Sequence, residues 1–212
     1  MEFERNNNSK KNKEEFSEFW ENIYLEGDAG WDLGGPTPVF VELSNNLKKG
    51  KVCIIGCGRG YDSIVFAKKG FKVTAVDFAP TAISFLNKMV AKENVNVRVI
   101  KDDIFNLLPQ FQNYFDYVIE QTCFCAIHRS KRKEYEILVK GLLKRDGLLV
   151  GLWFPMDKSI DEGGPPYGVT EKEVKSIFQV GWEIIKEEFS EFSVKPRIGR
   201  EKLIIFKNID EK

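Results

Sequence analysis

The sequence predicts an α/β fold, in which a mostly parallel sheet carries helices on both faces and ends in an antiparallel hairpin. Between residues 51 and 154, apolar runs typical of buried strands alternate with segments of helical periodicity. The last two apolar runs are separated only by the turn-like stretch 194–200. That stretch is too short for a helical crossover, so these two strands should pair antiparallel. The 212 residues, 42% of them hydrophobic, suit one domain with a sizeable core.

The N-terminal part is predicted to be a disordered polar tail, residues 1–13, followed by a helical lid, residues 14–49. The single domain would then span 14–212. One apolar face of the first lid helix is formed by Phe16, Phe19, Trp20 and Ile23. Pro38 suits the first turn of a second helix.

Strands and helices alternate through the middle of the chain, which predicts right-handed crossovers and a parallel sheet. The expected strands are residues 51–55, 72–78, 95–100, 115–121 and 148–154. The expected helices are residues 62–69, 80–93 and 129–144. Thr170 and Glu173 then fit a capping box that opens one more helix. The strands of the hairpin are expected at 182–192 and 201–208.

Composition argues against several classes of function. Lys and Arg total 32, as do Asp and Glu, so the chain lacks the basic excess of a nucleic-acid-binding protein. No apolar run approaches the roughly 20 residues of a membrane span, and the first residues lack the apolar core of a signal peptide. The four cysteines form no CxxC pair, so no metal site is expected. We expect a cytoplasmic protein with a small-molecule partner; the oligomeric state stays open, and a monomer is compatible with the sequence.

The stretch VCIIGCGRGYDS, residues 52–63, places a glycine-rich turn between a strand and a helix. Glycines let the backbone approach a ligand, and a helix N-terminus offers free N–H groups. A dinucleotide fingerprint has its third glycine five residues after the first, where this chain has Tyr61. A tyrosine there would crowd a pyrophosphate. Taken by itself, the turn is also compatible with a tight connection that binds nothing.

Acidic residues follow the neighbouring strands. Asp77 ends the second strand, about 20 residues after the glycines, where a carboxylate can accept hydrogen bonds from a ribose. Asp103 follows the third strand and Glu120 ends the fourth. Each acid taken singly is more typical of a solvated strand end. Together, at one edge of the sheet, they favour a ligand that contains a nucleoside.

Gly-x-Gly-x-Gly followed by these acids resembles the class I S-adenosylmethionine-dependent methyltransferases, over roughly residues 50–206. Further segments resemble the thiopurine S-methyltransferase superfamily, particularly its thiol/halide methyltransferase branch. They are FWENIYLEGDAGWDLGGPTPVF, FDYVIEQTCFCAI, GGPPYGVT and KPRIGREKL. The resemblance then covers nearly all of 14–207. It implies S-adenosylmethionine as cofactor and S-adenosylhomocysteine as product.

The resemblance also implies roles for residues. We add Glu120 to the cofactor-binding residues because of its place at a strand end. The predicted set is Trp20, Tyr24, Trp31, Gly56, Cys57, Gly58, Asp77, Asp103, Ile104 and Glu120. Tyr167 would face the methyl acceptor and is the candidate catalytic residue. Where the thiol/halide branch commonly has tryptophan, this chain has Tyr24.

The aromatic residues of the lid suit the charge of this cofactor. Its sulfonium is a cation, and a desolvated aromatic face stabilises a cation by about 0.5–2 kcal/mol. Trp31, in a glycine-rich loop outside any helical face, favours this role. Trp20 is equally explained by its place on the apolar helix face.

The methyl acceptor is expected to be a small, soft nucleophile. A neutral hydroxyl or amine acceptor usually needs a general base, and the chain has one histidine, His128, at a helix start where a solvent-facing residue is typical. A thiol, thiopurine, bisulfide, thiocyanate or halide needs less assistance. Arg197 and Arg200 would draw an anion to the site, or simply form a charged turn. The alternatives are a nicotinamide-dependent oxidoreductase and a non-catalytic S-adenosylmethionine-binding protein.

Overall fold

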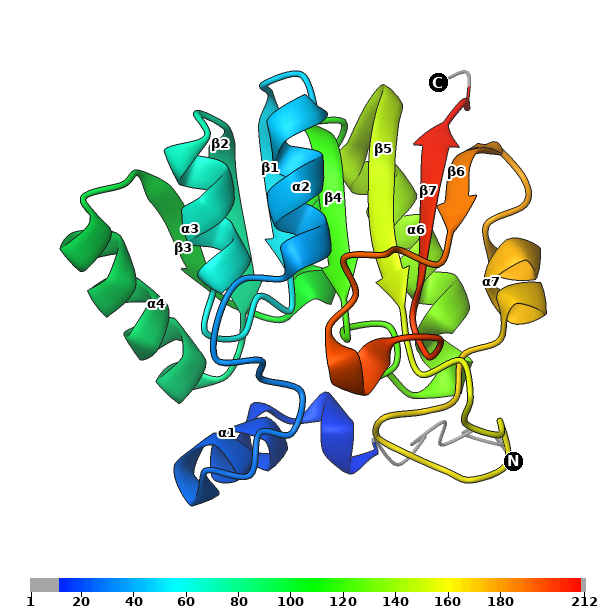
Figure 1. The fold of residues 1–212 in the computed structure, drawn as a ribbon, viewed down its shortest axis with the longest axis horizontal. Helices are drawn as coiled ribbons and strands as arrows, with labels where there is room; N and C mark the ends of the chain where they lie inside the picture. Colours follow the sequence, from blue (N-terminus) through cyan, green and yellow to red (C-terminus); the bar gives the residue numbers. More distant parts are fainter. Residues whose placement is uncertain (1–11, 211–212) are drawn as a thin grey trace, which may run out of the picture.

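The computed structural model describes residues 12–210, in which helices cover both faces of a seven-stranded sheet (Figure 1). The strands lie in the order β3-β2-β1-β4-β5-β7-β6. Their bounds are Lys51–Ile55 (β1), Lys72–Asp77 (β2), Val97–Lys101 (β3), Phe115–Gln121 (β4), Leu143–Trp153 (β5), Trp182–Glu188 (β6) and Lys202–Asn208 (β7). The predicted α/β fold is confirmed.

The parallel part of the sheet is built from β1 to β5. Strand β1 pairs in parallel with β2 and with β4, while β3 and β5 extend the sheet outward. The strand order therefore reverses between β1 and β4. In open α/β sheets, ligands bind outside the carboxyl ends of the strands at such a switch point.

The C-terminal strands form the predicted antiparallel hairpin. Strand β7 lies between β5 and β6 and is antiparallel to both. Strand β6 ends at Glu188, short of the expected residue 192, because a turn follows at 191–192. It forms one edge of the sheet, and its side chains after Trp182 are exposed.

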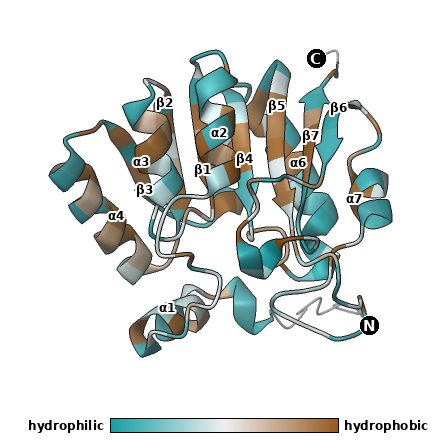
Figure 2. Ribbon diagram, in the orientation of Figure 1, coloured by the Kyte–Doolittle hydropathy of each residue, from teal (hydrophilic) through white to brown (hydrophobic). Residues whose placement is uncertain are grey.

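Side chains alternate between the two faces of the sheet, as a strand period of two requires. Val52 and Ile54 of β1 pack with helices α2 (Pro38–Asn46), α3 (Tyr61–Lys68) and α4 (Pro80–Glu93). Cys53 and Ile55 pack on the opposite face. The helices on that face are α5 (Leu108–Phe111), α6 (Arg132–Leu142) and α7 (Glu171–Ile177). Figure 2 shows the resulting hydrophobic strands and the more polar outer sides of the helices.

Boundaries around α6 and β5 also differ from the sequence prediction. The helix expected at 129–144 begins as a 3-10 turn, Arg129–Lys131, and α6 ends at Leu142. Strand β5 then starts at Leu143, before the expected residue 148, because Leu143 already pairs with Phe115 of β4 and the register shifts beyond it. The short helix α5 was not predicted.

The N-terminal segment crosses the carboxyl ends of the parallel strands, below the sheet in the view of Figure 1. A 3-10 turn, Lys13–Glu15, precedes helix α1 (Ser17–Glu26), which lies against α4. Most of the predicted disordered tail, residues 1–11, lies outside the described residues. Within residues 12–210, no helix combines the length and apolar character required to cross a membrane.

Candidate active site

A cavity lies where the N-terminal segment meets the loop between β1 and α3. The loop residues Gly56 to Arg59 form one wall, and the lid contributes the other. The residues that line the cavity are Tyr24, Trp31, Asp32, Leu33, Gly35, Gly56, Cys57, Gly58, Arg59, Tyr61, Asp62, Gln121 and Thr122. The cavity therefore opens at the switch point of the sheet.

The glycine loop has a backbone that other residues would strain. Gly56, Gly58 and Gly60 have φ of 56°, 54° and 73°, in the left-handed region that favours glycine. A Cβ added at Gly58 would lie 3.0 Å from the Tyr24 hydroxyl. The lid thus lies directly on the loop, and side chains there would block this close approach.

Asp77, at the end of β2, fixes the shape of the glycine loop. Its Oδ2 accepts a hydrogen bond from the Gly58 N–H at 2.8 Å, and its Oδ1 accepts one from the Ala79 N–H at 2.9 Å. Burial raises the pKa of the carboxyl, and these backbone N–H groups oppose the rise. Each carboxylate oxygen has a second lone pair, so Asp77 can hold the loop and still accept hydrogen bonds from ligand hydroxyls.

Asp103 and Ile104 follow β3 beside Asp77. The Asp102 N–H donates to the Asp77 carbonyl at 3.2 Å, which joins the two strand ends. Asp103 Oδ1 accepts a hydrogen bond from the Phe105 N–H at 3.0 Å and begins a 3-10 turn. Ile104 is buried. These residues flank the cavity without lining it.

Glu120, predicted to contact the cofactor, is enclosed by the protein itself. It is 1% exposed and accepts hydrogen bonds from Tyr135 Oη at 2.6 Å and from the Phe124 and Cys123 N–H groups. Burial raises its pKa to about 7 against these hydrogen bonds. The contact with Tyr135 directs the side chain toward α6, and Glu120 is not among the residues that line the cavity. The next residue, Gln121, lines the cavity instead.

The predicted aromatic residues of the lid form one cluster. Trp31 Nε1 donates to the Tyr24 hydroxyl at 3.2 Å, and the two rings meet edge to face with centroids 5.4 Å apart. Trp20 lies against Trp31 at a centroid distance of 5.4 Å. Tyr24 is buried, which raises the pKa of its hydroxyl. The structure therefore brings Trp20, Tyr24 and Trp31 together beside the glycine loop.

Sequence reasoning did not identify the polar residues that hold the lid on the glycine loop and on α4. Arg59 forms an ion pair with Asp32 at 2.9 Å. Glu21 of α1 accepts hydrogen bonds from both the N–H and the hydroxyl of Thr81, at the start of α4. The signal available for Arg59 was its place between two glycines of the loop. Asp32 and Glu21 are far from it in sequence and had no such signal.

A second polar network joins the lid to α3. Asp62 accepts hydrogen bonds from the Thr37 N–H at 2.8 Å and the Thr37 hydroxyl at 3.0 Å. The same hydroxyl lies 2.8 Å from the side-chain amide of Gln121. Burial raises the pKa of Asp62 to about 6. Asp62 and Gln121 both line the cavity, which adds polar groups that the sequence prediction missed.

Tyr167 lies at the other end of the lid. Its hydroxyl donates to Glu14 Oε1, and its N–H donates to the Cys125 carbonyl at 2.7 Å. His128 meets the Tyr167 ring edge to face at 5.4 Å, and its Nδ1 lies 2.8 Å from the Ser130 hydroxyl at a helix start. The histidine therefore has the helix-start role expected from the sequence.

The two predicted arginines have different environments. Arg197 is 4% exposed, and its Nη2 donates to the Trp31 carbonyl at 2.8 Å. Its Nη1 lies 3.7 Å from Glu201 and makes no hydrogen bond with the described residues. Arg200 is exposed and paired with Asp157 at 2.7 Å. The structure thus brings Arg197 to the lid and leaves Arg200 on the surface, paired with Asp157.

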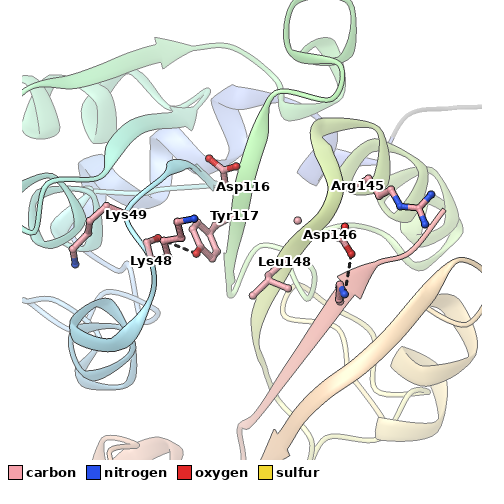
Figure 3. A pocket seen from close by; sticks show the side chains of 9 residues that line it. Lys48, Lys49, Asp116, Tyr117, Arg145, Asp146 and Leu148 are labelled. Atoms are coloured by element: carbon pink, nitrogen blue, oxygen red, sulfur yellow. Dashed lines mark hydrogen bonds and ion pairs between the residues drawn. The ribbon is translucent and has the colours of Figure 1, made fainter. Parts of the chain in front are cut away.

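Another cavity, of about 330 Å³, lies near the amino ends of β4 and β5, at the edge of the sheet away from the lid (Figure 3). Asp146 pairs there with Lys207 at 2.8 Å, and Tyr117 donates to the Lys48 carbonyl at 2.9 Å. No residue of the predicted site lines it. Asp116, which also lines it, pairs with Lys144 at 2.6 Å.

Comparison with known proteins identifies the family. The model of the thiopurine S-methyltransferase family matches residues 16–207. The chain belongs to this family. It is 34% identical to "Probable thiol methyltransferase 2" of Arabidopsis thaliana over 189 residues, which covers 87% of this chain and 82% of the relative. It is 31% identical to "Thiocyanate methyltransferase 1" of Brassica oleracea, with coverage of 90% and 85%.

Solved structures agree with the fold. A Burkholderia thailandensis 1,6-didemethyltoxoflavin-N1-methyltransferase, solved with S-adenosylhomocysteine, superposes with a TM-score of 0.72 at 19% identity. The alignment covers 92% of this chain and 87% of that chain. TehB from Haemophilus influenzae gives a TM-score of 0.65 at 18% identity and covers 89% and 67%. At these identities, the likeness concerns the fold.

The protein is therefore an S-adenosylmethionine-dependent methyltransferase, as the sequence predicted. Its own residues fit this cofactor. The glycine loop permits close backbone approach, Asp77 keeps free lone pairs beside it, and the aromatic cluster of the lid offers faces for a cation.

Proposed function

We propose that the protein transfers a methyl group to a small, soft nucleophile by direct in-line displacement. The acceptor classes are a thiol, thiopurine, bisulfide, thiocyanate or halide. The observation that carries this proposal is Arg197, a buried guanidinium under the lid. Its Nη1 lies 3.7 Å from Glu201 and makes no hydrogen bond within residues 12–210. Such a group can donate a hydrogen bond to a small acceptor that has a free lone pair, whether that acceptor is an anion or a neutral thiol. The names of the thiol and thiocyanate methyltransferase relatives support the same acceptor class.

The cofactor supplies an electrophilic methyl group on a sulfonium sulfur. We assign Gly56, Cys57 and Gly58 to its methionine and ribose parts and Asp77 to the ribose hydroxyls. Asp103 and Ile104 flank the side where the adenine would bind. Their position beside Asp77, through the backbone hydrogen bond at the strand ends, supports this assignment.

The lid contributes by excluding water and aligning the acceptor. In a displacement reaction, alignment and desolvation supply much of the acceleration. Tyr24 and Trp31, in edge-to-face contact over the loop, present aromatic faces toward a sulfonium. The pKa values of the Cys57 and Cys123 thiols are raised by burial, which disfavours a covalent enzyme intermediate and supports direct transfer.

Isothermal titration with S-adenosylmethionine, S-adenosylhomocysteine and NADH tests the cofactor. Binding of NADH in place of the other two would overturn the proposal in favour of an oxidoreductase. A methyl-transfer screen over thiols, thiopurines, bisulfide, thiocyanate and iodide then tests the acceptor. Cofactor binding without transfer to any of them would favour the non-catalytic binding protein.

The role of Tyr167 has its own test. We expect Tyr167→Phe to change acceptor turnover more than cofactor affinity, because its hydroxyl contacts Glu14 and lies outside the glycine loop. A variant with weakened cofactor binding and unchanged turnover would remove Tyr167 from the acceptor pocket.

A further inference from the structure

A buried carboxylate is paired with Tyr167. Glu14 is 6% exposed, although it belongs to the short turn at the start of the described chain, and its Oε1 accepts the hydrogen bond of the Tyr167 hydroxyl. The two residues are 153 positions apart, so only the folded lid brings them together. Within residues 12–210, the other hydrogen bond of Glu14 comes from Trp20 Nε1 and goes to the backbone carbonyl, so it does not require a carboxylate at position 14.

The pairing determines which hydrogen bond Tyr167 can offer a ligand. A phenol has one proton, and this proton is donated to Glu14. The hydroxyl oxygen can therefore only accept a further hydrogen bond. Burial, together with the neighbouring Glu14 carboxylate, raises the pKa of Tyr167, which keeps the phenol protonated. An acceptor that carries a proton suits this oxygen, whereas an anion gains no hydrogen bond from it.

The pair is connected to the rest of the site through the lid. Trp20 Nε1 donates to the Glu14 carbonyl at 2.9 Å, and the Trp20 ring lies against Trp31. Trp31 lines the cavity, and its carbonyl accepts the hydrogen bond from Arg197. Glu14 and Tyr167 are thus connected to the cavity wall and to the buried Arg197 through Trp20 and Trp31.

We propose that Glu14 and Tyr167 form a proton relay that selects a neutral thiol, rather than a preformed anion, as the methyl acceptor. This inference rests on the proposed function. In the step, the acceptor sulfur bonds to the methyl carbon while the bond from that carbon to the sulfonium sulfur breaks, and the leaving sulfur keeps the electron pair. The S–H proton passes to Tyr167 Oη, and the phenolic proton passes to Glu14 Oε1 and later to water.

The proton balance explains why a carboxylate suffices. A free thiol, with a pKa near 8.5, is a much weaker acid than a carboxylic acid. As the new S–C bond forms, however, the acceptor sulfur becomes positively charged and its S–H becomes strongly acidic. Proton transfer in the transition state then runs toward Glu14, as general-base catalysis requires.

The test compares wild type with Glu14→Gln, using 2-mercaptoethanol and potassium thiocyanate as acceptors. We expect the ratio of kcat/KM for the thiol to that for thiocyanate to fall at least tenfold, because glutamine cannot take the proton. Between pH 6 and 8, thiol turnover by the variant should rise about tenfold per pH unit with the thiolate fraction. Wild type should show a much shallower rise. Glu18→Gln, on the exposed side of α1, removes the same charge from the same segment and is the matched control.

A binding measurement gives a readout apart from turnover. Titration of 2-mercaptoethanol into the complex with S-adenosylhomocysteine at pH 6.5 should show weaker binding to Glu14→Gln than to wild type. Thiocyanate should bind the variant as tightly or more tightly, because a buried negative charge has been removed.

The outcomes separate the two proposals. Equal losses for both acceptors, or an unchanged ratio and an unchanged pH profile, would overturn the relay while the methyltransferase function stands. A wild type that prefers thiocyanate to every thiol would also overturn it. If wild type binds S-adenosylhomocysteine but methylates no thiol, the relay fails. The proposed function fails as well only if thiopurines, bisulfide, thiocyanate and iodide are not methylated either.

Discussion

Gly60→Ala tests whether the glycine loop is fixed by packing as well as by backbone conformation. Gly60 has φ of 73°, a region that costs an L-residue about 1–2 kcal/mol. A Cβ there would lie 2.4 Å from Leu86 Cδ1 and 2.8 Å from its Cδ2. Leu86 of α4 is fully buried, so it cannot move aside freely, and overpacking adds about 1–3 kcal/mol.

The expected total is a loss of about 2–5 kcal/mol in the free energy of unfolding, out of about 5–15 kcal/mol for a typical domain. In a chain of this size, about 3 °C of melting temperature corresponds to 1 kcal/mol, so the midpoint should fall by roughly 6–15 °C. Gly70→Ala is the matched control. Its φ is 86°, but nothing lies within 4 Å of the added Cβ, so only the backbone cost applies.

Urea unfolding and thermal melts of wild type, the two single variants and Gly60→Ala/Leu86→Ala measure both contributions. Removing the Leu86 side chain relieves the contact, so the double variant should be more stable than the sum of the single losses by about 1–3 kcal/mol. Equal destabilisation by Gly60→Ala and Gly70→Ala, together with no coupling to Leu86, would refute the packing argument.

Other predictions concern the carboxylates and the lid. Asp77→Ala should weaken S-adenosylhomocysteine binding by about 1–3 kcal/mol in titration calorimetry, and unchanged affinity would exclude the ribose role. Burial raises the pKa of Glu120 from its usual 4.5 to about 7 in the folded protein. The protonated carboxyl therefore stabilises the folded state fully below about pH 4.5, and this stabilisation is lost as the pH rises through 7. In urea unfolding, Glu120→Gln should reduce the difference in unfolding free energy between pH 5 and pH 8 by up to about 3 kcal/mol. The same difference in wild type and variant would contradict this prediction. Arg59→Ala removes the ion pair with Asp32 and should lower the free energy of unfolding by at most about 1 kcal/mol. It should also speed the release of S-adenosylhomocysteine, measured by stopped flow. An unchanged release rate would argue against the lid contact.

Much of the fold was predictable because it follows from local patterns. The short apolar run of β1 and the helical period of α4 separate strand from helix, and the short linker before β7 requires an antiparallel pair. The errors occurred where tertiary contacts decide a boundary. Strand β5 begins early because Leu143 finds a partner in Phe115, a pairing that no local pattern encodes.

The candidate site divides in the same way. Gly58 and Asp77 were identified because the switch point of a parallel sheet brings the strand ends together, and their hydrogen bond at 2.8 Å agrees with that reasoning. Glu120 also ends a strand, but its carboxylate turns toward Tyr135 of α6. Strand position defines where a residue lies along the sheet edge, and the packing of neighbouring helices decides which partner its side chain finds.

The sequence by itself determined the α/β order, the glycine turn and the family of the chain, because each depends on residue types at fixed spacings. Only the tertiary structure separated Arg197 from Arg200, since one is buried against Trp31 and the other is paired at the surface. Only it joined Glu14 to Tyr167. Contacts between distant segments depend on how the lid closes over the sheet, and no sequence period records that geometry.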